Sequence, residues 1–148
     1  MAIQQIRDNL YLIDIDQALE GFRKFISAWV CRIGGVTLLI DPGPAATIPH
    51  LVERLDELGI RTIDHILLTH IHLDHAGGTG QLLRRYPDAK VNCHPKGIPH
   101  MAAPQKLWEE SRKVLGKVAE AYGEMAPVPE SCISFSTGID LGAVSVEV

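Results

Sequence analysis

The sequence predicts an α/β fold built on a mixed sheet, and two observations support this prediction. Short apolar segments of strand character alternate along the chain with segments whose apolar residues recur at helical spacing. Clusters of glycine, proline and aspartate, such as Asp-Pro-Gly-Pro at 41–44, separate these segments. The length of 148 residues, with 46% hydrophobic and 22% charged residues, suffices for one globular domain and argues against a disordered chain.

Strands dominate the first half of the predicted order. The segments LYLIDI, AWVCRI and VTLLI are rich in aliphatic and aromatic residues, and Gly34-Gly35 between the last two indicates a hairpin turn. The next segment carries apolar residues on one helical face and ends at Gly59. IDHILLT is short and largely apolar, as in a strand that is covered on both sides. In order, these elements are strands 10–15, 28–33 and 36–40, helix 46–58 and strand 63–69.

The second half is expected to alternate helices with strands. A short helical segment stops at Pro87, and the strand KVNC follows it. The longest helical periodicity comes next and ends before Gly123, with Trp108 and Tyr122 expected in the core or at an interface. Two closing strands flank a turn at Asp140-Leu141-Gly142. In order, these elements are helix 80–86, strand 90–93, helix 105–122, and strands 132–135 and 144–148.

Composition excludes several classes of protein. No apolar run approaches 18 residues, and the N-terminus lacks the pattern of a secretory signal. The net charge of −4 and the absence of a Lys/Arg cluster argue against nucleic acid or an anionic membrane as a partner. The three cysteines are widely spaced, without a CxxC pair, which favours reduced thiols over a disulfide framework. We therefore expect a cytoplasmic protein.

The segment THIHLDHAGG at 69–78 carries the chemistry. In extended backbone His70 and His72 point to the same side and can hold one metal ion. Asp74 and His75 can reach a second ion where the strand turns into a helix, and two metals about 3.5–4 Å apart recur in hydrolases. A fully helical segment would instead align His70 with Asp74, but the β-rich run before it and the glycine pair after it disfavour that. Imidazole and carboxylate ligands suit zinc, iron or manganese.

The pattern HxHxDH followed by Gly-Gly resembles the signature of the metallo-β-lactamase superfamily. The hairpin that ends in LLIDPGP also resembles the first motif of that superfamily. The chain is most similar to the glyoxalase II-like branch of small metal-dependent hydrolases. The resemblance covers essentially the whole chain as the N-terminal half of an αββα sandwich, with a mixed sheet and helices on one face.

The resemblance implies a role for each residue of the motif. His70 and His72 would hold the first metal, and Asp74 and His75 the second, with zinc as the expected ion and iron or manganese possible. Asp74 would also act in catalysis by orienting the nucleophile. A metal-activated water would attack an ester, thioester, lactone or amide of a small-molecule substrate. Asp41 would accept a hydrogen bond from a metal-bound histidine, although an Asp before Pro-Gly can also simply initiate a turn.

The family pattern requires more ligands than these 148 residues contain. A third histidine in a T-P-G-H-like segment, a bridging aspartate and a final histidine are all missing. The expected domain, 1–148, is therefore truncated before the C-terminal half and lacks the second sheet. Its apolar face would be exposed and could pair in a homodimer.

Two other functions stay open at this stage. The chain could be a non-catalytic metal-binding half-domain completed by a partner chain, or an iron-dependent oxidoreductase of the same superfamily. His94 and His100 follow the strand next to the site but have no role in the family motifs, and His50 and His65 suggest none. In the superfamily that the chain resembles, the region between the two half-sites can form a helical cap over the active site, and the resemblance implies that helix 105–122 could serve in this way.

Overall fold

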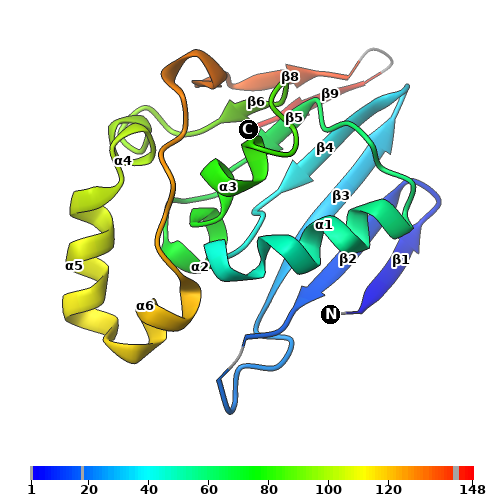
Figure 1. Ribbon diagram of the computed structural model, residues 1–148. Helices are drawn as coiled ribbons and strands as arrows, with labels where there is room; N and C mark the ends of the chain where they lie inside the picture. The colour runs from blue at the N-terminus through cyan, green and yellow to red at the C-terminus, as the bar shows by residue number, and fades with distance from the viewer. Residues whose placement is uncertain (1, 18, 142–143) are drawn as a thin grey trace.

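A mixed seven-stranded sheet organises the chain, with helices against one face (Figure 1). The computed structural model describes residues 2–17, 19–141 and 144–148. Strand order follows chain order, β1 (Ile3–Arg7), β2 (Leu10–Ile15), β3 (Ile26–Ile33), β4 (Val36–Ile40), β5 (His65–Leu67), β6 (Lys90–Asn92) and β7 (Ile133–Ser134). A separate two-stranded sheet pairs β8 (Gly138–Asp140) with β9 (Ser145–Glu147). The predicted fold class is confirmed.

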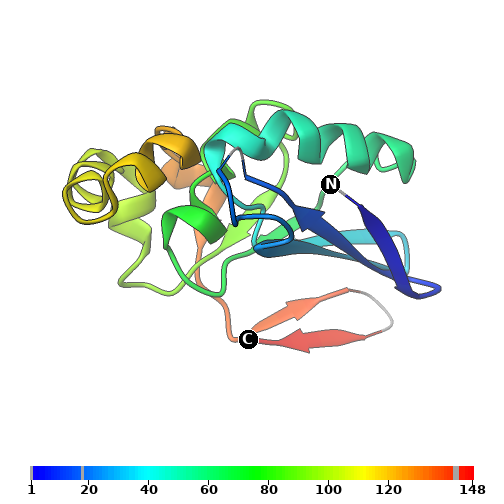
Figure 2. The same ribbon diagram turned by 90° about the horizontal axis from the view of Figure 1, so that it is seen from below.

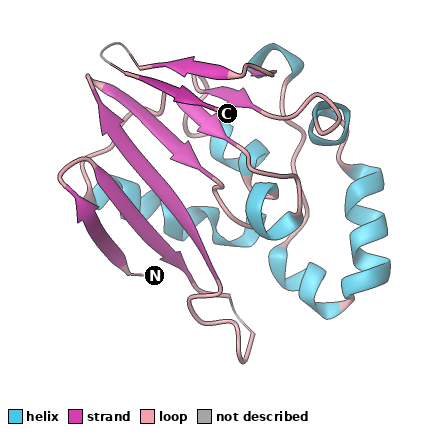
Figure 3. Cartoon of the chain, turned by 180° about the vertical axis from the view of Figure 1, so that it is seen from behind, coloured by secondary structure: helices cyan, strands magenta, loops and turns pink. Residues whose placement is uncertain are grey.

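Strand direction changes at β4, and this change positions the site. β1 to β4 pair antiparallel, whereas β4, β5, β6 and β7 pair in parallel (Figure 3). Parallel neighbours require crossover connections, and helical segments supply them. The carboxyl ends of the parallel strands consequently meet at one edge of the sheet, where α/β proteins usually bind ligands.

The helices are short and irregularly interrupted. α5 is the longest with 11 residues, and no helix in the described ranges is long and apolar enough to cross a membrane. The helical segments are η1 (Ala45–Thr47), α1 (Ile48–Glu57), α2 (Leu73–Ala76), α3 (Thr79–Leu83), α4 (Ile98–Ala102), α5 (Gln105–Leu115), α6 (Lys117–Tyr122) and η2 (Glu130–Cys132).

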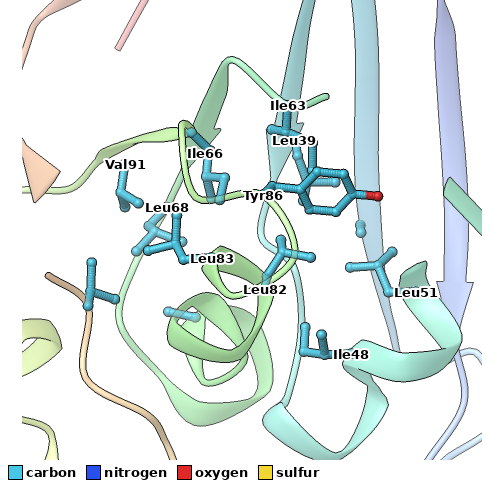
Figure 4. Close-up of a cluster of buried hydrophobic side chains, with 14 of the residues drawn as sticks. Leu39, Ile48, Leu51, Ile63, Ile66, Leu68, Leu82, Leu83, Tyr86 and Val91 are labelled. Carbon is cyan, nitrogen blue, oxygen red and sulfur yellow. The ribbon is translucent and has the colours of Figure 1, made fainter. Parts of the chain in front are cut away.

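The main core lies between the sheet and the helices α1 and α3 (Figure 4). Leu39, Ile66 and Val91 stand opposite one another on β4, β5 and β6, so their side chains form one row on the same face. All three are at most 1% exposed, beneath Leu51 of α1 and Leu82 of α3. Burial of this row stabilises the parallel strands whose ends carry the histidine-rich segment 69–78.

A small second sheet covers part of the opposite face. Leu38 points away from the helices and packs in a separate cluster with Ile139 and Leu141, and β8 and β9 lie on this side of the large sheet (Figure 2). The expectation of no second sheet is therefore wrong in part, because β8 was not predicted as a strand. Of the predicted turn at 140–142, Asp140 belongs to β8 and Gly142 lies outside the described residues.

The predicted helix at 105–122 is two helices. Gly116 breaks it with φ 54° and ψ −123°, a conformation that side chains with a Cβ rarely adopt. Apolar periodicity continues across the break, and the sequence pattern therefore concealed it. The pattern also missed β1, a largely exposed edge strand, and the five-residue helix α4. Such short or exposed elements have weak apolar periodicity, so the sequence pattern does not reveal them.

Replacing Ile66 with alanine tests the central core. Ile66 is fully buried in β5, so removing its side chain should lower the free energy of unfolding by about 2–5 kcal/mol. Urea denaturation measures this loss. Val114→Ala is the control, since its side chain is 83% exposed and the change should stay within about 0.5 kcal/mol. Equal losses for the two variants would contradict the burial of Ile66.

Candidate metal centre

The histidine-rich motif lies at the carboxyl ends of the parallel strands. Asp41 follows β4 directly, and Thr69 and His70 follow β5. The backbone N–H of Asp41 donates to the carbonyl of Leu67 at 3.0 Å, which ties the two strand ends together. The site therefore occupies the edge at which ligands bind in parallel α/β sheets.

The motif divides between extended and helical backbone. His70 lies in the loop that follows β5, and His72 has the extended values φ −63° and ψ 151° as the residue that precedes α2. Asp74 and His75 fall within the single turn of α2. The expected turn from strand to helix is present, and only its last part is helical. This change of backbone brings Asp74 and His75 round to the side of the first two histidines.

The glycine pair lets α2 pack closely. The N–H of Gly43 donates to the carbonyl of His75, and the N–H of Gly78 donates to the carbonyl of Gly43, both at 2.8 Å. A Cβ on Gly78 would lie 2.3 Å from the Cδ1 atom of Ile48 and 2.9 Å from the Gly43 oxygen. Any larger residue at 78 would push the loop after β4 away from α2.

Asp41 is the hub of the hydrogen bonds behind the histidines. Its Oδ1 accepts from the backbone N–H of Thr69 at 2.9 Å, and its Oδ2 accepts from the Thr69 hydroxyl at 2.6 Å. Oδ2 also lies 3.1 Å from Nδ1 of His75. The residue is 7% exposed and has a positive φ of 49°, which aspartate tolerates better than most side chains. The hydrogen bond to a motif histidine is the contact expected of Asp41.

This network selects one tautomer for two imidazoles. An acceptor carboxylate requires the proton of His75 to be on Nδ1. Because the Thr69 hydroxyl gives its proton to Asp41, its oxygen accepts from Nδ1 of His70, 2.9 Å away. In both neutral rings Nε2 then keeps a lone pair. The sequence alone assigned no role to Thr69, and the structure shows that its hydroxyl links His70 to Asp41.

Three pairs of the four motif side chains lie close together, whereas His72 and Asp74 stay outside the tightest group of potential ligand atoms. The ring centroid of His70 is 4.8 Å from that of His72 and 4.2 Å from that of His75. Oδ2 of Asp74 lies 3.7 Å from Nε2 of His75. Among the described residues, one trio has potential ligand atoms all within 4.8 Å of one another, namely Asp41, His70 and His75. Since Asp41 already accepts three hydrogen bonds, we interpret it as a support for the rings.

The remaining histidines stand apart from this cluster. His94 packs against Phe135, with ring centroids 5.9 Å apart, and accepts a hydrogen bond from the Lys96 backbone. His100 is exposed on α4, and His50 is exposed on α1 beside Glu53. Within the described ranges none of them joins the candidate metal group.

Electrostatics keep a lone pair available on His70. Loss of hydration lowers the pKa of the His70 ring below its ordinary value, and the neighbouring His75 and His72 rings lower it further. Asp41 and Asp74 oppose this shift. The shift favours the neutral form of the ring, which is the form that ligates a metal. Imidazole nitrogens beside a carboxylate form a donor set that zinc, iron or manganese accepts.

The sequence model of the metallo-beta-lactamase superfamily matches residues 21–148. The chain belongs to the metallo-beta-lactamase superfamily. Its similarity to hydroxyacylglutathione hydrolase from Legionella pneumophila (strain Corby) is 42% identity over 68 residues, which is 46% of this chain and 25% of that enzyme. The resemblance to the superfamily and to its glyoxalase II-like branch is confirmed.

Solved metallo-beta-lactamase structures share the fold. An archaeal superfamily protein from Sulfolobus tokodaii superposes with a TM-score of 0.76 at 26% identity, over 93% of this chain and 53% of that one. A subclass B3 metallo-beta-lactamase from a soil metagenome library gives a TM-score of 0.72 at 21% identity, over 99% of this chain and 51% of its own. The chain thus spans about half of these structures and a quarter of the curated relative.

The His75 tautomer is a direct test of the network. At about pH 8, above the ordinary histidine pKa of about 6.5, long-range ¹H–¹⁵N spectra of the metal-free chain should show His75 protonated on Nδ1. Asp41→Ala removes the acceptor and should shift the ring towards the Nε2-protonated form. Asp88→Ala, which alters an exposed carboxylate elsewhere, should change nothing. A wild-type His75 protonated on Nε2 would refute the hydrogen bond to Asp41.

Proposed function

We propose that this chain supplies the metal-binding half of a metal-dependent hydrolase that cleaves an ester, thioester, lactone or amide. The observation that carries the proposal is the contact of His70, His72, Asp74 and His75 at the carboxyl ends of the parallel strands, braced by Asp41. The similarity to hydroxyacylglutathione hydrolase over the same region supports hydrolysis as the reaction class.

The donor set fits a metal centre. His70 and His72 would hold one ion, and Asp74 and His75 a second, with zinc as the first candidate and iron or manganese as alternatives. The lone pairs on Nε2 of His70 and His75 are free of the Asp41–Thr69 network and so remain available to ligate. Bound ions would supply a water of lowered pKa as nucleophile and would stabilise the developing oxyanion.

The protein's own groups then orient the reaction. Asp41 fixes the His75 ring and, through the Thr69 hydroxyl, the His70 ring, so that neither turns when a ligand binds. Asp74 is partly exposed beside His75 and can accept a proton from the nucleophile as well as bind metal. The scissile carbonyl would approach from the solvent side, where His70 and His72 are exposed.

In this proposal further ligands come from outside these 148 residues. They belong either to more of the same polypeptide or to a second chain, for example in a homodimer that uses the face β8 and β9 cover in part. The match to about half of each solved structure supports such a completion. Three further points stay predictions: that the substrate is a small molecule, that neither nucleic acid nor a membrane is a partner, and that the protein is cytoplasmic.

Metal binding tests the ligand assignment. The wild-type chain should bind zinc stoichiometrically in equilibrium dialysis followed by elemental analysis, and His72→Ala should abolish this binding because it removes one imidazole of the set. His100→Ala is the matched control, since it removes an exposed imidazole outside the cluster. Unchanged metal content in His72→Ala would show that the assignment is wrong.

Hydrolysis tests the reaction class. Metal-loaded protein is assayed with ester, thioester, lactone and amide substrates, both as this chain and as the longer product if the reading frame continues with a T-P-G-H-like segment. Asp74→Asn should lower kcat/KM by about 100-fold or more, whereas His100→Ala should leave it unchanged. Metal binding without hydrolysis in either form would favour the non-catalytic half-domain. One bound iron with oxygen consumption would favour the oxidoreductase.

A further inference from the structure

We propose that the cleft between α5 and α2 binds an uncharged, apolar acyl group of the substrate. This inference rests on the proposed hydrolase function and narrows its substrate class. The cleft has a volume of about 520 Å³ and includes both His72 and Asp74 in its lining. That volume lies within the range of small-molecule sites, and any ligand held at the two motif residues must occupy part of it.

Exposed apolar side chains converge on this cleft. Phe25 is 49% exposed, Val114 83% and Leu115 43%, and all three line it. Phe25 comes from the loop between β2 and β3, where its ring contacts Phe22, whereas the other two come from α5. Single exposed apolar residues need no explanation, but their convergence beside candidate metal ligands indicates a binding surface.

Several residues of α5 line the cleft. The helix has an apolar face, yet none of its residues is buried. Figure 1 shows α5 and α6 standing beyond the edge of the sheet, on the side where α2 lies. Leu107 lines the cleft from α5, and the buried Tyr122 lines it from α6. Leu107 and Trp108 of α5 also pack against the main core, so Val114 and Leu115 are the apolar residues of α5 that line the cleft without contacting the core cluster.

Charge discriminates between acyl groups. Apart from the motif residues His72 and Asp74, which would face the metal ions, Glu110 is the charged side chain among the described residues that line the cleft, and none of those residues is a lysine or arginine. A carboxylate in the acyl chain would meet repulsion and would lose hydration without gaining a partner. A neutral hydrocarbon chain instead gains from burial against Leu107 and Val114. This half of the site thus favours aliphatic acyl groups over anionic ones.

A series of hydroxamic acids tests the cleft. Acetyl, butanoyl, hexanoyl and octanoyl hydroxamic acids are titrated into the zinc-loaded protein by calorimetry. Affinity should rise about fourfold per methylene until the cleft is full, which corresponds to about 0.8 kcal/mol for each buried CH₂. Val114→Asp should lower hexanoyl affinity about tenfold and spare acetyl affinity. The control Phe135→Asp places the same carboxylate at an exposed apolar position outside the cleft and should spare the hexanoyl affinity. Affinity that does not rise with chain length overturns the proposal.

A second pair of variants isolates the charge effect. Adipic monohydroxamic acid carries a terminal carboxylate and should bind the wild type at least tenfold more weakly than the hexanoyl compound. Glu110→Lys should reverse this preference. Glu109→Lys makes the same charge change at the neighbouring helix position, outside the cleft lining, and should have a much smaller effect. Equal effects of the two variants would show that the cleft does not discriminate by local charge.

Failure of the metal centre and failure of the cleft have different signatures. If acetohydroxamic acid shows no zinc-dependent binding, the proposed function fails. Hexan-1-ol titrated into the metal-free protein tests the cleft alone, and NMR methyl shifts should appear at Leu107, Val114 and Leu115. Absence of these shifts overturns the cleft proposal whatever the metal does. Dimer dissociation by Val114→Asp with unchanged hexanol shifts would assign the surface to a second copy and also overturn it.

Discussion

The carboxylate of Asp41 is the interaction on which the site depends. One side chain joins three segments, since it lies at the end of β4 and accepts hydrogen bonds from Thr69 after β5 and from His75 on α2. These segments are 28 and 34 residues apart from Asp41 in sequence. A buried acceptor that satisfies three donors fixes position and tautomer together, which a surface contact between flexible side chains cannot do.

The backbone around Asp41 imposes a second constraint. Asp41 itself adopts positive φ, and Gly43 two residues later does the same at 89°. The chain can then turn sharply, so that Gly43 exchanges hydrogen bonds with the backbone at His75 and Gly78. The Asp-Pro-Gly-Pro motif and the distant Gly-Gly pair are therefore in direct contact through these backbone hydrogen bonds. Their residue types follow from the close approach of the loop to α2.

Much of this arrangement was predictable because it is local. Strand ends, hairpin turns and the strand-to-helix turn at the histidine motif depend on short-range chemistry, and the sequence predicted them close to their observed bounds. Asp41 could be linked to a histidine only through the resemblance to a family, since no local pattern connects residues 34 positions apart. The break at Gly116 and the strand β8 escaped prediction for a related reason. Apolar spacing continues across the first, and the second depends on pairing with β9.

The core and the cleft differ in how far their apolar side chains are buried. The row formed by Leu39, Ile66 and Val91 is almost fully buried, and substitutions there disturb the strands that end at the metal-binding motif. In α5, Leu107 and Trp108 pack against this core, whereas Val114 and Leu115 are exposed and line the cleft. Val114 and Leu115 can therefore change at little cost to folding while the motif stays in place. Under the proposed function, changes at Val114 and Leu115 would alter which acyl group the cleft accepts without disturbing the core.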